Sequence, residues 1–141
     1  MRKLILLGRS GSGKTTLTQV LRGKEVKYEK TQYINYHSKI IDTPGEYAEN
    51  ASLGRALALY SYEADVCGIL ISATEEYSLF PPNITCLTNR EVIGIVTKCD
   101  KKDANVDRAI RWLKLTGCEK VFCVSSKTLD GIDKLLEYLN K

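Results

Sequence analysis

The sequence predicts an α/β fold in which a mostly parallel sheet is covered by helices on both faces. Short apolar runs bounded by turn-forming residues recur along the chain, as is typical of buried parallel strands. They lie at residues 4–7, 40–41, 66–71, 92–96 and 121–124. Apolar residues at helical spacing fall around residues 17–21, 106–113 and 132–139. This alternation implies right-handed crossovers, so ligands are expected at the carboxyl ends of the strands.

Length and composition narrow the class of protein. The 141 residues are too few for two independent cores, so residues 1–141 are expected to form a single domain. With 43% hydrophobic and 27% charged residues, the chain matches an ordinary soluble protein. No apolar run approaches the roughly 20 residues that a bilayer crossing requires, and a strand pattern replaces any targeting segment. The expectation is a cytoplasmic protein without a membrane span.

Five cysteines and a mild net charge of +4 limit the chemistry further. The odd cysteine count, without a CxxC pair, favours reduced thiols over a disulfide framework. A basic stretch could meet a phosphate-rich partner or lie in a solvated loop, the commoner outcome for a charge run. It comprises Arg22, Lys24, Lys27 and Lys30. Because the chain lacks the aromatic and zinc motifs of nucleic-acid readers, no nucleic-acid partner is expected.

A glycine-rich segment between the first strand and the first helix carries the clearest motif. Residues 8–15 fit GxxxxGK[ST], the phosphate-binding P-loop, in the required strand-to-helix context. Its backbone N–H groups are expected to cradle phosphates, with Lys14 at the β and γ phosphates and the Thr15 hydroxyl on Mg²⁺. The predicted cradle consists of Gly8, Ser10, Gly11, Ser12, Gly13, Lys14, Thr15 and Thr16.

A second motif follows the apolar pair at residues 40–41, where the chain reads Asp-Thr-Pro-Gly. The carboxylate of Asp42 at a strand end can orient Mg²⁺ and its waters. Gly45 can then offer its N–H to the γ phosphate. The alternative is a plain Asx turn, because this sequence is favourable turn chemistry in any protein.

A third motif, Thr-Lys-Cys-Asp at residues 97–100, has the pattern of a guanine-reading element. Asp100 can accept hydrogen bonds from the N1–H and the amino group of guanine, a donor pair that adenine lacks. The stem of Lys98 can lie along the base, and Thr97 stands at the strand end. The predicted nucleotide is therefore GTP, with ATP as the alternative.

The segment after the last strand can complete the base site. Ser125, Ser126 and Lys127 follow residues 121–124 and can offer backbone N–H groups to the base carbonyl. The alternative is that they cap the final helix.

Two segments, residues 23–32 and 44–54, are expected to be long mobile loops that flank the phosphates. Thr31 lies in the first loop and is the candidate for a second Mg²⁺ ligand that arrives only with a γ phosphate. An ordinary loop threonine is the alternative.

These motifs, in this order along the chain, resemble those of the TRAFAC-class GTPases. More narrowly, Lys-Thr-Gln at 30–32, Asp-Thr-Pro-Gly-Glu-Tyr at 42–47 and the compact length resemble the EutP/PduV family of ethanolamine- and propanediol-utilisation proteins. The resemblance implies a small GTPase-like P-loop NTPase domain. It also implies a cytosolic protein working beside a bacterial microcompartment that processes an aldehyde, with a shell protein or a pathway enzyme as partner.

Three positions depart from the pattern that this resemblance implies. Glu46 stands where many GTPases carry the glutamine that orients the attacking water, so slow hydrolysis is expected. Thr97 replaces the commoner asparagine, which weakens the expected link to the P-loop. Gly11 stands where potassium-activated relatives place an asparagine. The residues expected at the reacting phosphate are Lys14, Thr31 and Glu46.

Three functions remain open from the sequence. The first is a switch in which GTP and Mg²⁺ order the two loops and alter the surface shown to a partner. The second is an ATP-dependent phosphotransferase that passes the γ phosphoryl group to a short carboxylate such as acetate or propionate. The third is a module that binds nucleotide without turnover, which is consistent with Glu46.

Overall fold

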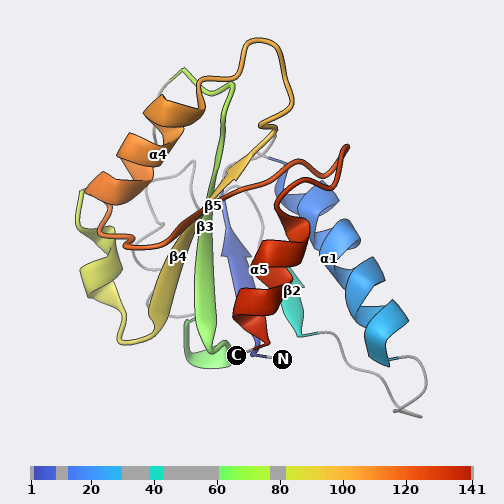
Figure 1. Ribbon diagram of the computed structural model, residues 1–141. Helices are drawn as coiled ribbons and strands as arrows, with labels where there is room; N and C mark the ends of the chain where they lie inside the picture. The colour runs from blue at the N-terminus through green and yellow to red at the C-terminus, as the bar shows by residue number, and fades with distance from the viewer. Residues whose placement is uncertain (1, 9–12, 30–38, 43–60, 77–81, 141) are drawn as a thin grey trace.

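Five parallel strands form one sheet in the order β2-β1-β3-β4-β5 (Figure 1). The computed structural model describes residues 2–8, 13–29, 39–42, 61–76 and 82–140. Its strands are β1 Leu4–Leu7, β2 Ile40–Asp42, β3 Val66–Ser72, β4 Glu91–Thr97 and β5 Val121–Cys123. Each corresponds to a predicted apolar run, because strands covered on both faces need apolar side chains throughout.

Helices cover both faces of this sheet, as predicted. Helices α1 Lys14–Glu29 and α5 Ile132–Leu139 lie on one face, and α4 Val106–Leu115 lies on the other (Figure 1). Two short 3₁₀ helices, η1 Ser61–Glu63 and η2 Ile84–Leu87, lie in the connections. None of the helices described is long and apolar enough to cross a membrane.

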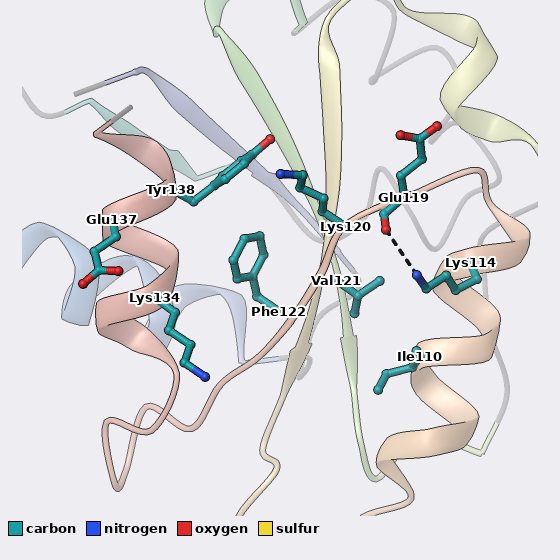
Figure 2. A pocket seen from close by; sticks show the side chains of 9 residues that line it. All are labelled: Ile110, Lys114, Glu119, Lys120, Val121, Phe122, Lys134, Glu137 and Tyr138. Atoms are coloured by element: carbon teal, nitrogen blue, oxygen red, sulfur yellow. Dashed lines mark hydrogen bonds between the residues drawn. The ribbon is translucent and has the colours of Figure 1, made fainter.

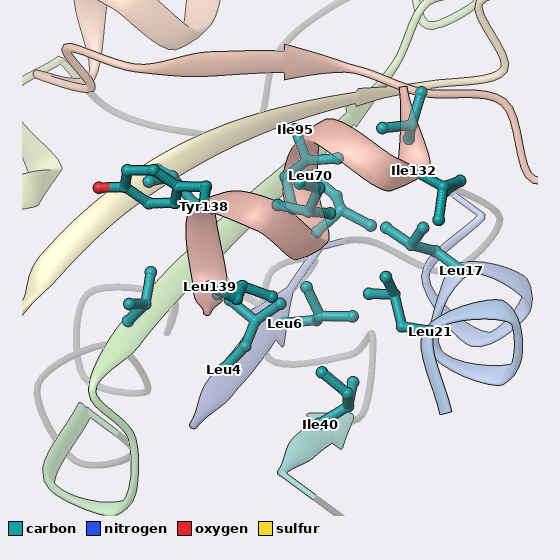
Figure 3. Close-up of a cluster of buried hydrophobic side chains, with 14 residues drawn as sticks. Leu4, Leu6, Leu17, Leu21, Ile40, Leu70, Ile95, Ile132, Tyr138 and Leu139 are labelled. Atoms are coloured by element: carbon teal, nitrogen blue, oxygen red, sulfur yellow. The ribbon is translucent and has the colours of Figure 1, made fainter. Parts of the chain in front are cut away.

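The core has two layers because successive side chains of a strand point to opposite faces. Leu4 and Leu6 of β1 pack with Leu17 and Leu21 of α1 and with residues of α5 (Figure 3). The intervening Ile5 and Leu7 pack on the other face, in the cluster that holds Ala109 and Leu113 of α4. Strand β1 is thus buried on both faces of the sheet.

One predicted loop is partly wrong. Helix α1 continues to Glu29, so residues 23–29 are helical and only residues 30–32 of that segment fall outside the described part. The predicted loop began at Gly23, but a glycine inside a helix costs only about 0.5–1 kcal/mol relative to alanine. The residues after it, Lys-Glu-Val-Lys-Tyr-Glu, include strong helix formers that offset this cost. The second predicted loop, residues 44–54, lies outside the described residues.

The basic stretch also differs from the solvated loop that was expected. Arg22, Lys24 and Lys27 lie on helix α1, and Lys30 lies outside the described residues. The Arg22 guanidinium donates to the backbone oxygen of Ile40, with Nη2 at 2.8 Å and Nε at 3.2 Å. This contact ties the helix to strand β2.

Candidate nucleotide-binding site

Two described glycines, Gly8 and Gly13, stand at the end of β1 and at the start of helix α1. Gly8 is buried, and Gly13 has a φ of +90°, a conformation that favours glycine. The N–H of Leu17 donates to the backbone oxygen of Gly13 at 2.9 Å, so the helical hydrogen bonds begin at this glycine. Ser10, Gly11 and Ser12 lie outside the described residues. The N-terminus of α1 therefore lies at the carboxyl end of the parallel sheet, where β1 ends.

Lys14 is the first residue of α1, and its side chain is 6% exposed. The first turn of the helix contains no acidic residue. Helix N-termini present free N–H groups and a positive dipole, so a buried ammonium group at this position fits a bound polyphosphate. Thr15 and Thr16 are exposed in the same turn.

The end of β4 packs against the end of the P-loop. A Cβ atom built on Gly13 would lie 3.4 Å from Thr97 Oγ1 and 3.7 Å from Lys98 Cε. Thr97 is 3% exposed, so this contact is buried. The backbone of Lys98 has a φ of 58°. Such positive values are uncommon for residues other than glycine and recur at functional sites. Thr97, which replaces the commoner asparagine, thus makes the contact between the two motifs.

A hydrogen bond between Asp100 and Ser125 joins the segment after β4 to the segment after β5. Ser125 Oγ donates to Asp100 Oδ1 at 2.8 Å, and the N–H of Thr128 donates to Ser125 Oγ at 3.1 Å. The hydrogen bond from Ser125 lowers the pKa of the Asp100 carboxyl below its ordinary value. Asp100 is exposed. The site therefore presents an ionised carboxylate whose second oxygen can accept a further hydrogen bond.

Residues 125–127 do not cap the final helix, which was the alternative interpretation. Helix α5 begins at Ile132, and its N-cap is Gly131 with a φ of 78°. Ser125 instead stabilises its own turn, since its N–H donates to the backbone oxygen of Asp130 at 3.0 Å. Ser126 is half-buried and Lys127 is exposed in this turn.

Two residues that support this turn were missed in the sequence. Thr128 Oγ1 donates to Asp130 Oδ2 at 3.0 Å. Both residues thus hold the loop that carries Ser125. The available signal was the dipeptide Asp-Gly at residues 130–131, which is typical of tight turns.

Several predicted site residues lie outside the described part of the chain, namely Ser10, Gly11, Ser12, Thr31, Gly45 and Glu46. For Asp42 the structure describes the backbone, which ends β2 in register with Leu6 of β1. That register brings the end of β2 beside the end of β1. The assignment of Thr15, Thr31 and Asp42 as Mg²⁺ ligands stays a prediction.

A groove of about 590 Å³ lies elsewhere on the molecule, beside the edge strand β5 and between α4 and α5 (Figure 2). Phe122 and Tyr138 point toward it, and Lys114 at its rim donates from Nζ to the backbone oxygen of Glu119 at 3.1 Å. None of the predicted nucleotide-binding residues lines this groove. We place the candidate site at the converging motifs, because the groove holds none of the residues that fit a nucleotide.

Comparison with known proteins gives consistent matches. The model of the PduV-EutP family, described as "Ethanolamine utilisation - propanediol utilisation", matches residues 1–141. The chain is 40% identical over 141 residues to the propanediol utilization protein PduV of Citrobacter freundii, with 99% of this chain and 94% of that protein covered. It is 30% identical over 142 residues to a protein of Escherichia coli K12 named "Probable acetate kinase EutP", with 99% and 89% covered.

Solved structures match the same fold. A probable GTP-binding protein, engB, superimposes with a TM-score of 0.62 at 22% identity, covering 97% of this chain and 98% of that chain. The structure of Era in complex with MgGDPNP and part of 16S ribosomal RNA has a TM-score of 0.61 at 19% identity, covering 96% and 54%. The predicted GTPase-like P-loop fold is thereby confirmed.

Proposed function

The chain belongs to the PduV-EutP family of ethanolamine and propanediol utilisation, and we propose that it is a slow GTPase that acts as a nucleotide-dependent switch in that metabolism. The observation that carries this proposal is the hydrogen bond from Ser125 to Asp100, at the same sheet edge where Thr97 packs on Gly13. Three motifs distant in sequence thus meet where a nucleotide would connect them.

The base side of the site favours guanine. An ionised Asp100 can accept from both the N1–H and the amino group of guanine, whereas adenine offers it no such pair. The hydrogen bond from Ser125 orients the carboxylate beforehand, which reduces the cost of ordering it on binding. Lys98, whose side chain lies beside Gly13, can run along the face of the base.

The phosphate side is assigned to the P-loop and its neighbours. Lys14 would bind oxygens of the β and γ phosphates, and backbone N–H groups at the start of α1 would bind the rest. Thr15, Asp42 and Thr31 would hold Mg²⁺, which supplies positive charge against the phosphate oxygens. Glu46 cannot donate a hydrogen bond to water as glutamine does, and its charge opposes a γ phosphate, so hydrolysis would be slow.

The switch would act through the segments that contain Thr31 and residues 44–54. Contacts of Thr31 and Gly45 with the γ phosphate would order these segments in the GTP state and release them after hydrolysis. The surface that changes would be read by a microcompartment shell protein or a pathway enzyme. We place the protein in the cytoplasm, beside the microcompartment.

A second candidate function is ATP-dependent phosphoryl transfer to a short carboxylate. It is favoured by the 30% identity to the Escherichia coli protein named "Probable acetate kinase EutP". The same cradle could present a γ phosphoryl group to acetate or propionate instead of to water. A module that binds nucleotide without turnover is the third possibility.

Nucleotide binding and product analysis distinguish these functions. The purified protein is titrated with GTP and with ATP in the presence of Mg²⁺, and products are followed with and without acetate or propionate. The switch predicts a preference for GTP and a slow release of phosphate that is independent of the carboxylate. A preference for ATP together with acyl phosphate formation would contradict the switch and support the phosphotransferase. Tight binding without any product would support the module that binds nucleotide without turnover.

A further inference from the structure

Two cysteines flank the base side of the candidate site. Cys99 directly precedes Asp100, and Cys123 ends β5 two residues before Ser125. Strands β4 and β5 are neighbours (Figure 1), and their register pairs Val96 with Cys123. The N–H of Cys99 donates to the backbone oxygen of Val124 at 3.4 Å. The backbone therefore holds the two cysteines on adjoining segments.

The thiols of Cys99 and Cys123 also contact each other. A side-chain hydrogen bond between them acts on the pKa of both thiols. Cys99 Sγ also donates at 3.4 Å to the backbone oxygen of Val96, the residue that pairs with Cys123 in the sheet. Both side chains are half-buried against the α4 layer of the core. Cys99 and Cys123 are thus partly exposed, whereas Cys67 and Cys118 are buried.

We propose that Cys99 and Cys123 form a dithiol site that hydroperoxides oxidise to an intramolecular disulfide, which joins the two turns that carry Asp100 and Ser125. One thiolate attacks a peroxide oxygen and breaks the O–O bond, giving a sulfenic acid and releasing water or an alcohol after proton uptake. The second thiol then attacks the sulfenic sulfur, forms the S–S bond and displaces hydroxide, which leaves as water with the thiol proton. The two sulfurs lose two electrons and the hydroperoxide gains them.

The environment sets the speed of this oxidation. Burial raises the pKa of Cys99 to about 11, and the nearby Cys123 and Asp100 act in the same direction. Burial and Asp107 also raise the pKa of Cys123, although its contact with Cys99 opposes this. Because the thiolate is the attacking species, oxidation is slow at neutral pH and accelerates as the pH rises.

The consequence for nucleotide rests on the proposed function. A bond between residues 99 and 123 holds Asp100 and Ser125 in the paired arrangement that they have in the structure. Release of the base requires these turns to separate from it, so the disulfide slows release. The expected effect is a several-fold slower dissociation of a fluorescent GDP analogue, reversed by dithiothreitol.

The site itself is tested without nucleotide. Wild type, Cys99→Ser and Cys123→Ser are treated with hydrogen peroxide at pH 8 and at pH 9, and disulfides are mapped by non-reducing peptide mass spectrometry. The matched control is Cys86→Ser, which removes an exposed cysteine outside the pair. Wild type and Cys86→Ser should lose two hydrogen atoms in one peptide pair that joins residues 99 and 123, faster at the higher pH. Disulfides that involve only Cys86, or none at either pH, would overturn the proposal.

The coupling to nucleotide is tested on the same samples. Slower GDP release in oxidised wild type and Cys86→Ser, but not in peroxide-treated Cys99→Ser, supports it. An unchanged release rate in a protein that carries the mapped disulfide would refute the coupling. If no sample binds guanine nucleotide while the 99–123 disulfide is mapped, the proposed function fails and the dithiol site stands.

Discussion

Lys14 is a buried, positively charged residue at the phosphate side of the candidate site, so its removal is the most direct test of phosphate binding. Lys14→Ala should lower nucleotide affinity by at least tenfold, because hydrogen bonds to charged groups contribute about 1.5–3 kcal/mol each. Calorimetric titration with GTP and Mg²⁺ measures this loss, and Lys134→Ala on the exposed side of α5 is the control. If the folded Lys14→Ala protein bound nucleotide with wild-type affinity, the assignment of residues 8–15 as a phosphate-binding P-loop would be wrong.

Thr15 separates metal binding from phosphate binding. Thr15→Ala should weaken GTP binding in the presence of Mg²⁺ by about 1.5 kcal/mol, or roughly tenfold, because one ligand of the metal is lost. In EDTA the mutant and the wild type should bind alike. Fluorescence titrations with and without the metal provide the comparison, and an equal loss in both would contradict the role in metal binding.

Asp100 decides the choice of base. Asp100→Ala should lower GTP affinity by roughly tenfold or more, because two donors of guanine lose their acceptor, and it should barely change ATP affinity. Asp100→Asn should shift the preference toward xanthine nucleotides, whose C2 carbonyl matches the new amide donor. Competition against a fluorescent analogue measures each ratio. If Asp100 serves only its own turn, both mutants will lose stability while the GTP-to-ATP ratio stays constant.

At the scale of elements, helix α4 approaches strand β4 unusually closely. A Cβ atom on Gly94 would lie 2.9 Å from Leu113 Cδ1 and 3.1 Å from Leu113 Cβ. Since Leu113 is fully buried, the helix itself would have to move. Gly94 is therefore the residue that allows this helix to cover the sheet.

A pair of glycine substitutions tests this packing. Gly94→Ala should lower the free energy of unfolding by about 1–3 kcal/mol through overpacking. Gly23→Ala is the matched control, because nothing lies within 4 Å of its Cβ position and the residue is inside helix α1. It should raise stability by about 0.5–1 kcal/mol. Urea unfolding measures both, and an equally stable Gly94→Ala protein would show that α4 is not closely packed.

At the scale of the whole molecule, a polar cluster joins three distant segments at the amino ends of the strands. Arg2 pairs with Glu91 at 2.6 Å, and its Nη2 donates to the backbone oxygen of Tyr138 at 2.7 Å. The Tyr138 hydroxyl donates to Glu91. The Arg2 guanidinium and the Lys120 ammonium lie 4.7 Å and 4.8 Å from the centre of the Tyr138 ring. The start of β1, the start of β4 and the end of α5 are thus held together, opposite the candidate site.

This cluster predicts a specific loss of stability in acid. Burial alone would raise the pKa of Glu91, but hydrogen bonds from Tyr138 and Arg2 outweigh it and lower the pKa below the ordinary 4.5. A depressed folded-state pKa contributes stability above the unfolded-state value, and that contribution is lost as the pH falls through the folded-state pKa. Arg2 and Glu91 side chains are 30% and 41% exposed, so the contribution is about 1 kcal/mol at most.

Glu91→Gln measures this contribution. The mutant should be less stable than wild type at pH 7, and the difference should shrink as the pH falls below about 4.5. Thermal unfolding across pH 3–7 provides the data, with Glu137→Gln on the exposed side of α5 as control. A difference that is independent of pH would mean that Glu91 acts by packing rather than by its charge.

Much of the fold was predictable because its signals are local. A strand buried on both faces needs a continuous apolar run, and all five strands fall on such runs. The P-loop is equally local, since its glycines, Lys14 and Thr15 fall within the eight residues 8–15, and the helix that the motif requires begins at Lys14. The local signal failed at residues 23–29, which were expected to belong to a mobile loop but continue helix α1.

The contacts between distant segments were decided by the tertiary structure. The sequence places Asp100 and Ser125 in separate motifs, and the pairing of β4 with β5 brings their side chains to 2.8 Å. The same pairing brings Cys99 beside Cys123, although the two cysteines are 24 positions apart in the sequence. The fold also brings Arg2 into contact with Tyr138, although the two residues are 136 positions apart in the sequence. Such contacts depend on strand order and register, which emerge from the packing of the whole sheet rather than from any local pattern.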